Sequence, residues 1–273
     1  MSTDTEFTKT SIELDVLGVG LKLAVLYRTG EKPPILFLHG FGSTKEDYAD
    51  VALHPQFNGH SVIVYDAPGC GETECTDLSA VSIPFLVETA RQLLAHLSVT
   101  RFHLIGHSMG GLTALILADA EPDRVLSFID IEGNVAPEDC FLSRQIIDFP
   151  AESTEIFFDD FIERTWHSRY YSAAFYAAGL RHRVRVAAVR GIFMSMVELS
   201  DHGDLMRRFL SLRCPRMFMY GEQNQQLSYL PELRENGVRV ARVSSCGHFP
   251  MYSNPVEMWL LISEFFSHLD YQF

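Results

Sequence analysis

The chain has few cysteines, a shortage of basic residues and no long apolar run. Its five cysteines are odd in number and scattered without a C-x-x-C pair, so we expect no disulfide framework and a cytoplasmic location. Lys and Arg number 22 against 35 Asp and Glu, which argues against nucleic acid or an anionic membrane as partner. No window approaches the roughly 18 apolar residues of a membrane span, and the start "MSTDTEFTKT" lacks the apolar stretch of a signal peptide.

Signatures of metal and nucleotide sites are also missing. The sequence contains no H-E-x-x-H, no EF-hand loop and no clustered Cys/His spacing, and "GFGSTKED" has no G-x-G-x-x-G. Cys246 stands two residues before His248, but we expect it to be structural. We therefore expect no cofactor and no metal, and a small molecule as the partner. A homodimer stays open.

Short apolar runs do alternate with helical patterns from about residue 33 to residue 133. The earlier runs "SIELDV" and "LKLAVLYRTG" favour a hairpin, and "VSIPFLVETARQLLAHL" has the spacing of a one-sided helix. The alternation resumes with "PRMFMYGEQ", "VRVARVSSCG" and a closing helix in "NPVEMWLLISEFFSHL". This order predicts an α/β fold, a mostly parallel sheet with helices on both faces.

Between residues 134 and 212 the alternation stops and aromatic residues become frequent. We interpret this segment as a helical cap inserted into a core of residues 1–133 and 213–273. Its aromatics either pack among themselves or line an apolar cavity, and Trp166, Tyr170 and Phe161 are our candidate substrate-binding residues. The basic "RHRVRVAAVR" is expected to be solvated or paired with the acidic "FFDDFIER", with contact to a substrate carboxylate as the alternative.

Ser108 lies in a G-x-S-x-G motif, within "HLIGHSMGGL". An apolar run precedes it and a helical pattern follows, the context of a sharp strand-to-helix turn that exposes a nucleophilic hydroxyl. The alternative is a small residue at an ordinary tight turn. A nucleophile needs donors for the developing oxyanion, and we expect the backbone N–H groups of Met109 and of Phe41 in "FLHGFGS".

Four motifs occur in order along the chain: "LHGFGS", "YDAPGCGET", "GHSMGG" and "CGHFP". Together they resemble the α/β-hydrolase superfamily over nearly the whole chain. The resemblance implies the α/β-hydrolase fold and a catalytic triad in the order serine, acid, histidine. It makes His248 the expected base and Asp66, within "DAPGCG", a structural residue. The neighbouring His107 is expected to point away from Ser108.

The acid of the triad is the open position. Gly221 is followed three residues later by Asn224, where many family members have an aspartate, and an amide carries no charge to stabilise an imidazolium. The resemblance offers a second place, the end of the strand after the nucleophile helix, as in zearalenone lactonases and some haloalkane dehalogenases. Glu132 matches that place. Asp130 falls on the same side of the strand and competes with it, and Glu222 also stays open.

A serine nucleophile excludes dehalogenase chemistry, which needs an aspartate. We therefore predict a serine hydrolase that cleaves a carboxylic ester or lactone of a moderately apolar small molecule through an acyl-enzyme. Two alternatives remain: a carbon–carbon bond hydrolase of the same fold, and a ligand-binding homologue that has lost turnover.

Overall fold

The structure, a computed structural model, describes residues 6–269. Residues 1–5 and 270–273, which the sequence analysis assigns to the core, lie outside the described residues. Its strands are β1 (Thr8–Val16), β2 (Val19–Arg28), β3 (Lys32–Leu38), β4 (His60–Tyr65), β5 (Glu74–Cys75), β6 (Phe102–His107), β7 (Val125–Ile131), β8 (Arg216–Gly221) and β9 (Arg239–Val243). These residues form one sheet in the order β1-β2-β4-β3-β6-β7-β8-β9, with β5 beside β2. β1 and β2 are the predicted antiparallel hairpin, and β4 through β9 run parallel along that order.

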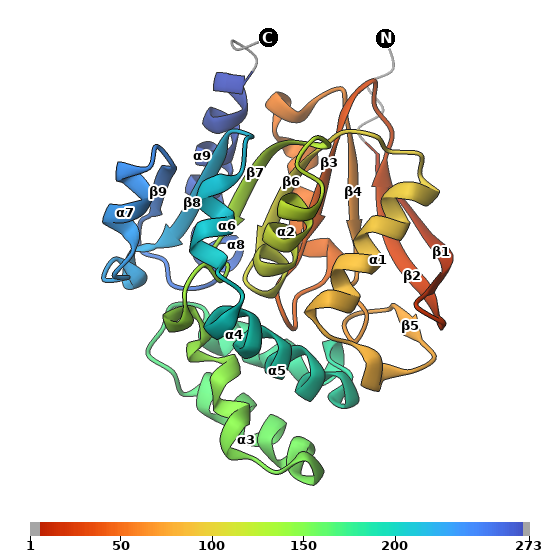
Figure 1. Cartoon of the computed structure of the whole chain (residues 1–273), viewed down its shortest axis with the longest axis vertical. Coiled ribbons are helices and arrows are strands. Elements are labelled where there is room, and N and C mark those ends of the chain that lie inside the picture. The colour runs from red at the N-terminus through yellow and green to blue at the C-terminus, as the bar shows by residue number, and fades with distance from the viewer. Residues whose placement is uncertain (1–5, 270–273) are drawn as a thin grey trace.

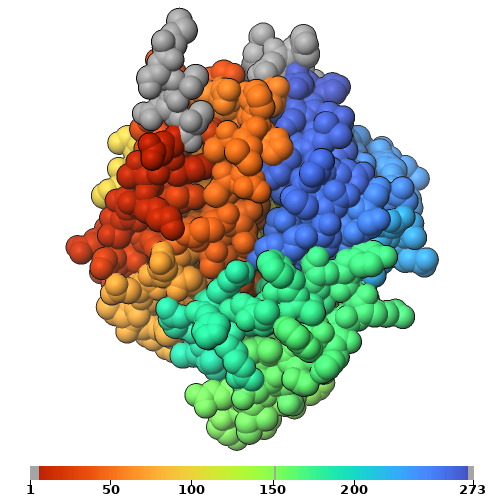
Figure 2. All heavy atoms as spheres, turned by 180° about the vertical axis from the view of Figure 1, so that it is seen from behind, coloured from red at the N-terminus to blue at the C-terminus, as the bar shows by residue number. Residues whose placement is uncertain are grey.

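Helices cover both faces of this sheet (Figure 1). The α-helices of the described residues are α1 (Ile83–His96), α2 (Met109–Ala120), α3 (Thr154–Trp166), α4 (Ala173–Arg183), α5 (Val186–His202), α6 (Leu205–Ser211), α7 (Leu230–Glu235), α8 (Pro250–Ser253) and α9 (Pro255–Leu269). α1, α2 and α6 lie on one face, and α9 lies on the opposite face, where it is exposed in the view from behind (Figure 2). The predicted α/β fold is confirmed. Among residues 6–269, no helix is both long and apolar enough to cross a bilayer.

The central strands are buried along their whole length because both of their faces are covered. Every residue of β4 and of β6 is buried, including the polar side chains of His60, Ser61, His103 and His107. α2 is likewise buried on most of its surface, since it packs on β6 between α1 and α6. Because helices pack on both faces of these strands, the strand ends that carry the site are held in place.

The segment between β7 and β8 holds the short 3₁₀ helices η4 (Pro137–Phe141), η5 (Ser143–Asp148) and η6 (Ala151–Ser153), followed by α3 to α6. α3, α4 and α5 extend from one end of the sheet (Figure 1). α6 differs, because it contacts α2, with Arg208 3.1 Å from Asp119. The division into core and cap stays a prediction, and we call residues 134–212 the inserted segment.

Aromatic residues of the inserted segment pack with one another and with the sheet domain. Phe157, Phe161 and Phe193 form a mutual cluster, and the Phe193 ring centroid lies 4.6 Å from that of Phe41. Phe41 belongs to the loop after β3. The segment's aromatic core is therefore continuous with the loop expected to supply an oxyanion donor.

Candidate active site

Ser108 sits at a strained turn between β6 and α2, with φ 52° and ψ −119°. Such a conformation costs about 1–3 kcal/mol and persists only where its surroundings enforce it. The flanking glycines make it possible: a Cβ on Gly106 would lie 2.4 Å from the Gly110 oxygen, and one on Gly110 only 2.1 Å from the Leu38 oxygen. The sequence thus places the Ser108 hydroxyl at the end of the central strand.

His248 follows β9 and faces the serine. Its Nε2 lies 2.9 Å from Ser108 Oγ, and the side chain is nearly buried. His107 hydrogen-bonds the backbone oxygen of His248 at 2.7 Å through its own Nε2, so it supports the His248 backbone. Burial, together with the nearby His248, lowers the pKa of His107 to about 3, so its ring is neutral and Nε2 is the donor.

Glu132 lies directly after β7, in a left-handed conformation with φ 52°. Its Oε2 is 3.3 Å from His248 Nδ1 and accepts a hydrogen bond from Asn224 Nδ2 at 2.7 Å. Its Oε1 accepts from the backbone N–H of Gly221 at 2.6 Å. Asn224, at the family's usual acid position, therefore holds the carboxylate that faces the histidine.

The two other candidate acids differ from Glu132 in their surroundings. Asp130 is fully buried, neither of its oxygens makes a hydrogen bond, and its Oδ1 lies against Gly111 of α2. Burial raises its pKa well above the usual range, so the carboxyl is neutral. Glu222 accepts a hydrogen bond from the Ser245 N–H at 2.9 Å. Among the described residues, neither acid has a hydrogen bond to His248.

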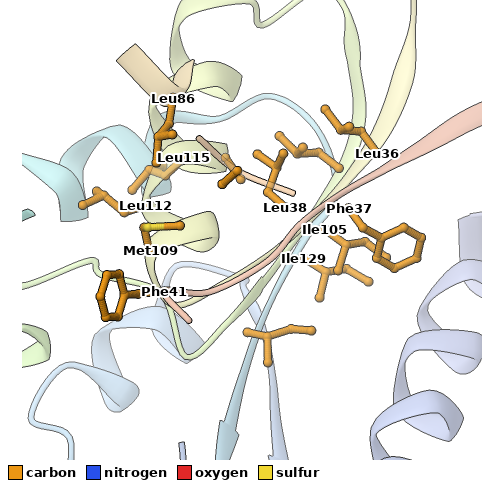
Figure 3. Packing of buried hydrophobic residues seen from close by; sticks show 14 of the residues in the cluster. Leu36, Phe37, Leu38, Phe41, Leu86, Ile105, Met109, Leu112, Leu115 and Ile129 are labelled. Atoms are coloured by element: carbon orange, nitrogen blue, oxygen red, sulfur yellow. The ribbon is translucent and has the colours of Figure 1, made fainter. Parts of the chain in front are cut away.

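The predicted oxyanion donors lie at the start of α2 and in the loop after β3 (Figure 3). Met109 is the first residue of α2, where a backbone N–H has no partner within the helix. The peptide that follows the Phe41 N–H is held in place, because the Phe41 carbonyl accepts a hydrogen bond from Tyr176 Oη at 2.7 Å. Gly42 follows with φ +72°, and a Cβ there would lie 2.3 Å from Leu180.

Known proteins resemble this chain over most of its length. The model of the alpha/beta hydrolase family matches residues 35–259 of the chain. The chain belongs to the alpha/beta hydrolase family. A monoacylglycerol lipase of Xenopus laevis is 26% identical over 265 residues, 89% of this chain and 77% of the relative. A proline iminopeptidase of Lactobacillus helveticus is 30% identical over 121 residues, but that match spans only 41% of the relative's length.

Solved structures of similar shape include two hydrolases of different substrates. A carboxylesterase of Nitrososphaera gargenis superimposes with a TM-score of 0.76 at 16% identity, covering 96% of this chain and all of the other. An N-acyl homoserine lactonase gives a TM-score of 0.73 at 17% identity, covering 97% and 98%. At such low identity these likenesses show the shared fold.

In this α/β hydrolase, buried contacts join the loop that carries Phe41 to the "DAPGCG" turn. Asp66 accepts hydrogen bonds from Lys45 Nζ at 2.9 Å and from the Glu72 N–H at 2.8 Å. His39 Nε2 accepts from the Ala67 N–H at 2.8 Å. Asp66 therefore belongs to a network that links these two loops, and its structural role stays a prediction.

Two spaces meet at His248. The inner cavity, about 20 Å³, reaches Ser108 and is walled largely by aromatic residues, including Phe41, Phe161 and Phe193. The outer chamber, about 180 Å³, touches His248 and Asn224. The two spaces share four lining residues, which are Phe141, Leu142, His248 and Phe249.

The three predicted substrate-binding residues have different positions. Phe161 is buried and lines the inner cavity, and Tyr170 lines the outer chamber. Trp166 is 48% exposed and lines neither space. Sequence reasoning missed Phe249, although it directly follows His248 in "CGHFP". It also missed Arg164, which lines the outer chamber and stands in the acidic stretch "FFDDFIER".

Proposed function

We propose that this α/β hydrolase cleaves a carboxylic ester or lactone of a moderately apolar small molecule through an acyl-enzyme. The observation that carries the proposal is the continuous contact from Ser108 Oγ through His248 to Glu132, at 2.9 and 3.3 Å. Ser108 and His248 border an apolar cavity, which suits an uncharged acyl group. The esterase, lactonase and lipase names among the similar proteins support this substrate class.

In the first half-reaction, Ser108 Oγ attacks the carbonyl carbon and His248 Nε2 accepts the hydroxyl proton. The Glu132 carboxylate stabilises the resulting imidazolium. The N–H groups of Phe41 and Met109 donate to the oxyanion of the tetrahedral intermediate. When the intermediate collapses, the bond to the alcohol oxygen breaks, and His248 returns the proton to that oxygen.

In the second half-reaction, water takes the place of the alcohol. His248 accepts a proton from the water as it attacks the acyl carbon, and returns that proton to Ser108 Oγ. With a lactone the leaving oxygen stays attached to the acyl chain, so the product is a hydroxy acid. The chemistry is otherwise the same.

Hydrolysis of a p-nitrophenyl ester by wild type and by Ser108→Ala tests the proposal. We expect kcat/KM to fall by about 10⁴-fold or more in the variant. Ser211→Ala, at an exposed serine of α6, is the matched control and should retain activity. Full activity of Ser108→Ala would overturn the proposal.

A fluorophosphonate probe gives a second readout that needs no substrate. Mass spectrometry of the labelled wild type should locate the probe on Ser108. Folded protein that stays unlabelled would favour the alternative of ligand binding without turnover.

A further inference from the structure

The outer chamber contacts the histidine of the site but not the serine. His248 is among its lining residues, whereas Ser108 lines only the inner cavity. In the proposed reaction the acyl group stays bonded to the serine, and the departing alcohol takes its proton from the histidine. The alcohol part of the substrate therefore belongs in the outer chamber.

The inner cavity is too small for a long acyl chain. Its volume of about 20 Å³ is close to the space that one water occupies. The outer chamber is about nine times larger, from 180 against 20 Å³. The two volumes together favour a small acyl group on a larger alcohol.

One wall of the outer chamber carries a positive charge. Arg164, in the last turn of α3, lines the chamber together with the hydroxyl-bearing Thr165 and Ser168. Among the described lining residues there is no carboxylate, and Arg164 is the one with a guanidinium. This cation is conspicuous in a chain of net charge -13.

The guanidinium is oriented by a neutral partner. Arg164 Nε and Nη2 both donate to Gln145 Oε1, at 3.2 and 3.0 Å, and Gln145 Nε2 donates in turn to the Phe141 carbonyl at 3.1 Å. Its closest carboxylate partner, Asp160, is 3.8 Å from Nη1, and both side chains are about half exposed. An exposed ion pair at that distance contributes little free energy, so the guanidinium of Arg164 is available to bind another anion.

We infer that the outer chamber is a leaving-group subsite for an alcohol that bears a carboxylate, with Arg164 as the recognition residue and Gln145 as its positioning residue. The inference rests on the proposed function. Because the Nε–Nη2 edge of the guanidinium faces Gln145, a planar carboxylate would accept two hydrogen bonds from Nη1 and Nη2. The apolar side chains of Leu142 and Phe249 border the same chamber and suit the body of the alcohol.

Two pairs of acetate esters test this subsite. The meta- and para-carboxyphenyl acetates carry the anion, and the meta- and para-carbamoylphenyl acetates are their neutral counterparts with the same acyl group. After subtraction of the uncatalysed rates, wild type should prefer at least one carboxyphenyl ester by about tenfold or more in kcat/KM. Arg164→Gln should remove that preference, because kcat/KM should fall by about tenfold more on the carboxyphenyl ester than on its carbamoyl counterpart.

Arg181→Gln is the matched control. Arg181 is an exposed arginine of α4 that pairs with Asp159 and lines neither the inner cavity nor the outer chamber. Its replacement should leave the preference intact, whereas added salt should weaken the preference in wild type.

Two results would overturn the subsite: equal kcat/KM for both members of each pair in wild type, or an equal loss on both esters in Arg164→Gln. In either case, if hydrolysis of the carbamoyl esters depends on Ser108, the proposed function holds although the subsite is rejected. If wild type hydrolyses no acetate, calorimetry on Ser108→Ala decides. Tighter binding of meta- or para-hydroxybenzoate than of the hydroxybenzamide supports the subsite, and equal binding overturns it.

Discussion

The end of the parallel sheet and the inserted segment contribute to the site in different ways. At the sheet end, backbone conformation places the proposed catalytic groups: Ser108 and Glu132 both have positive φ, at the ends of neighbouring strands. In the inserted segment, packing of side chains such as Phe161 and Phe193 shapes the space around them. Changes at the sheet end should therefore alter the rate, and changes in the segment should alter which substrate fits.

The largest effect is expected for Glu132. Glu132→Gln removes the charge that faces His248 Nδ1, and kcat should fall by about 10⁴-fold. Asp130→Asn replaces a neutral buried carboxyl by a group of the same shape and should keep kcat within about threefold. Steady-state kinetics on both variants checks this, and a loss confined to Asp130→Asn would move the acid to Asp130.

A smaller effect is expected for Asn224, which donates to the same Glu132 oxygen that faces the histidine. Asn224→Ala should lower kcat by about tenfold to a hundredfold, because a hydrogen bond to a charged group is lost. Asn224→Asp sets a second carboxylate beside the first, which should raise the apparent pKa of the acidic limb of the pH–rate profile.

Asn236→Ala, at the end of α7, is the control for Asn224 and should match wild type. An unchanged pH–rate profile in Asn224→Asp, with normal kcat in Asn224→Ala, would show that Glu132 needs no support from this side chain.

Within the inserted segment, replacement of Phe161 should change substrate preference, whereas replacement of Trp166 should not. Phe161→Ala enlarges the inner cavity and should raise the butanoate-to-acetate ratio of kcat/KM about tenfold. It should also lower stability by about 3–5 kcal/mol, so a thermal melt must accompany the kinetics. Trp166→Ala, at a residue that lines neither space, should leave the ratio within twofold. Equal shifts in both variants would contradict the assignment of the inner cavity.

The smallest effect concerns Asp139 in η4, beside the inner cavity. It accepts hydrogen bonds from the Val135 and Ala136 N–H groups and from Tyr229 Oη, yet burial raises its pKa to about 7. Because the folded state holds this proton more tightly than the unfolded state, its stabilising effect is present in acid and lost as pH rises from about 4 through about 7.

Asp139→Asn removes that titration. Its free energy of unfolding relative to wild type should therefore rise by on the order of 1 kcal/mol between pH 5 and pH 8. Urea unfolding of both proteins at the two pH values measures the difference. A constant difference would mean that Asp139 titrates in its ordinary range.

The same contrast explains what could be predicted from the sequence. Strand order and the turn at Ser108 follow from apolar runs and glycine spacing, which act through the backbone. Ser108, Glu132 and His248 lie within contact of one another in the way that the predicted triad requires. Their catalytic roles stay predictions. The cavity walls were not predictable in the same way, since Trp166 and Phe161 are alike in sequence context and only packing between distant segments distinguishes them. Arg164 did not stand out in the sequence because it ends "FFDDFIER", a stretch that we expected to act as an acidic partner of "RHRVRVAAVR".

The position of Glu132 has a consequence for how such enzymes can diversify. Ser108 and Glu132 belong to one β6–α2–β7 unit, joined by the Ser108 N–H bond to the Ile131 oxygen at 2.9 Å. The inserted segment begins only after this unit closes. We therefore expect that the segment can be exchanged with the proposed nucleophile and acid kept in register, provided that His248, the hydrogen bond from Tyr176 to Phe41 and the contact of α6 with α2 are restored. Recombination between relatives at residues 134 and 212 is then expected to change the substrate range and to keep the proposed reaction.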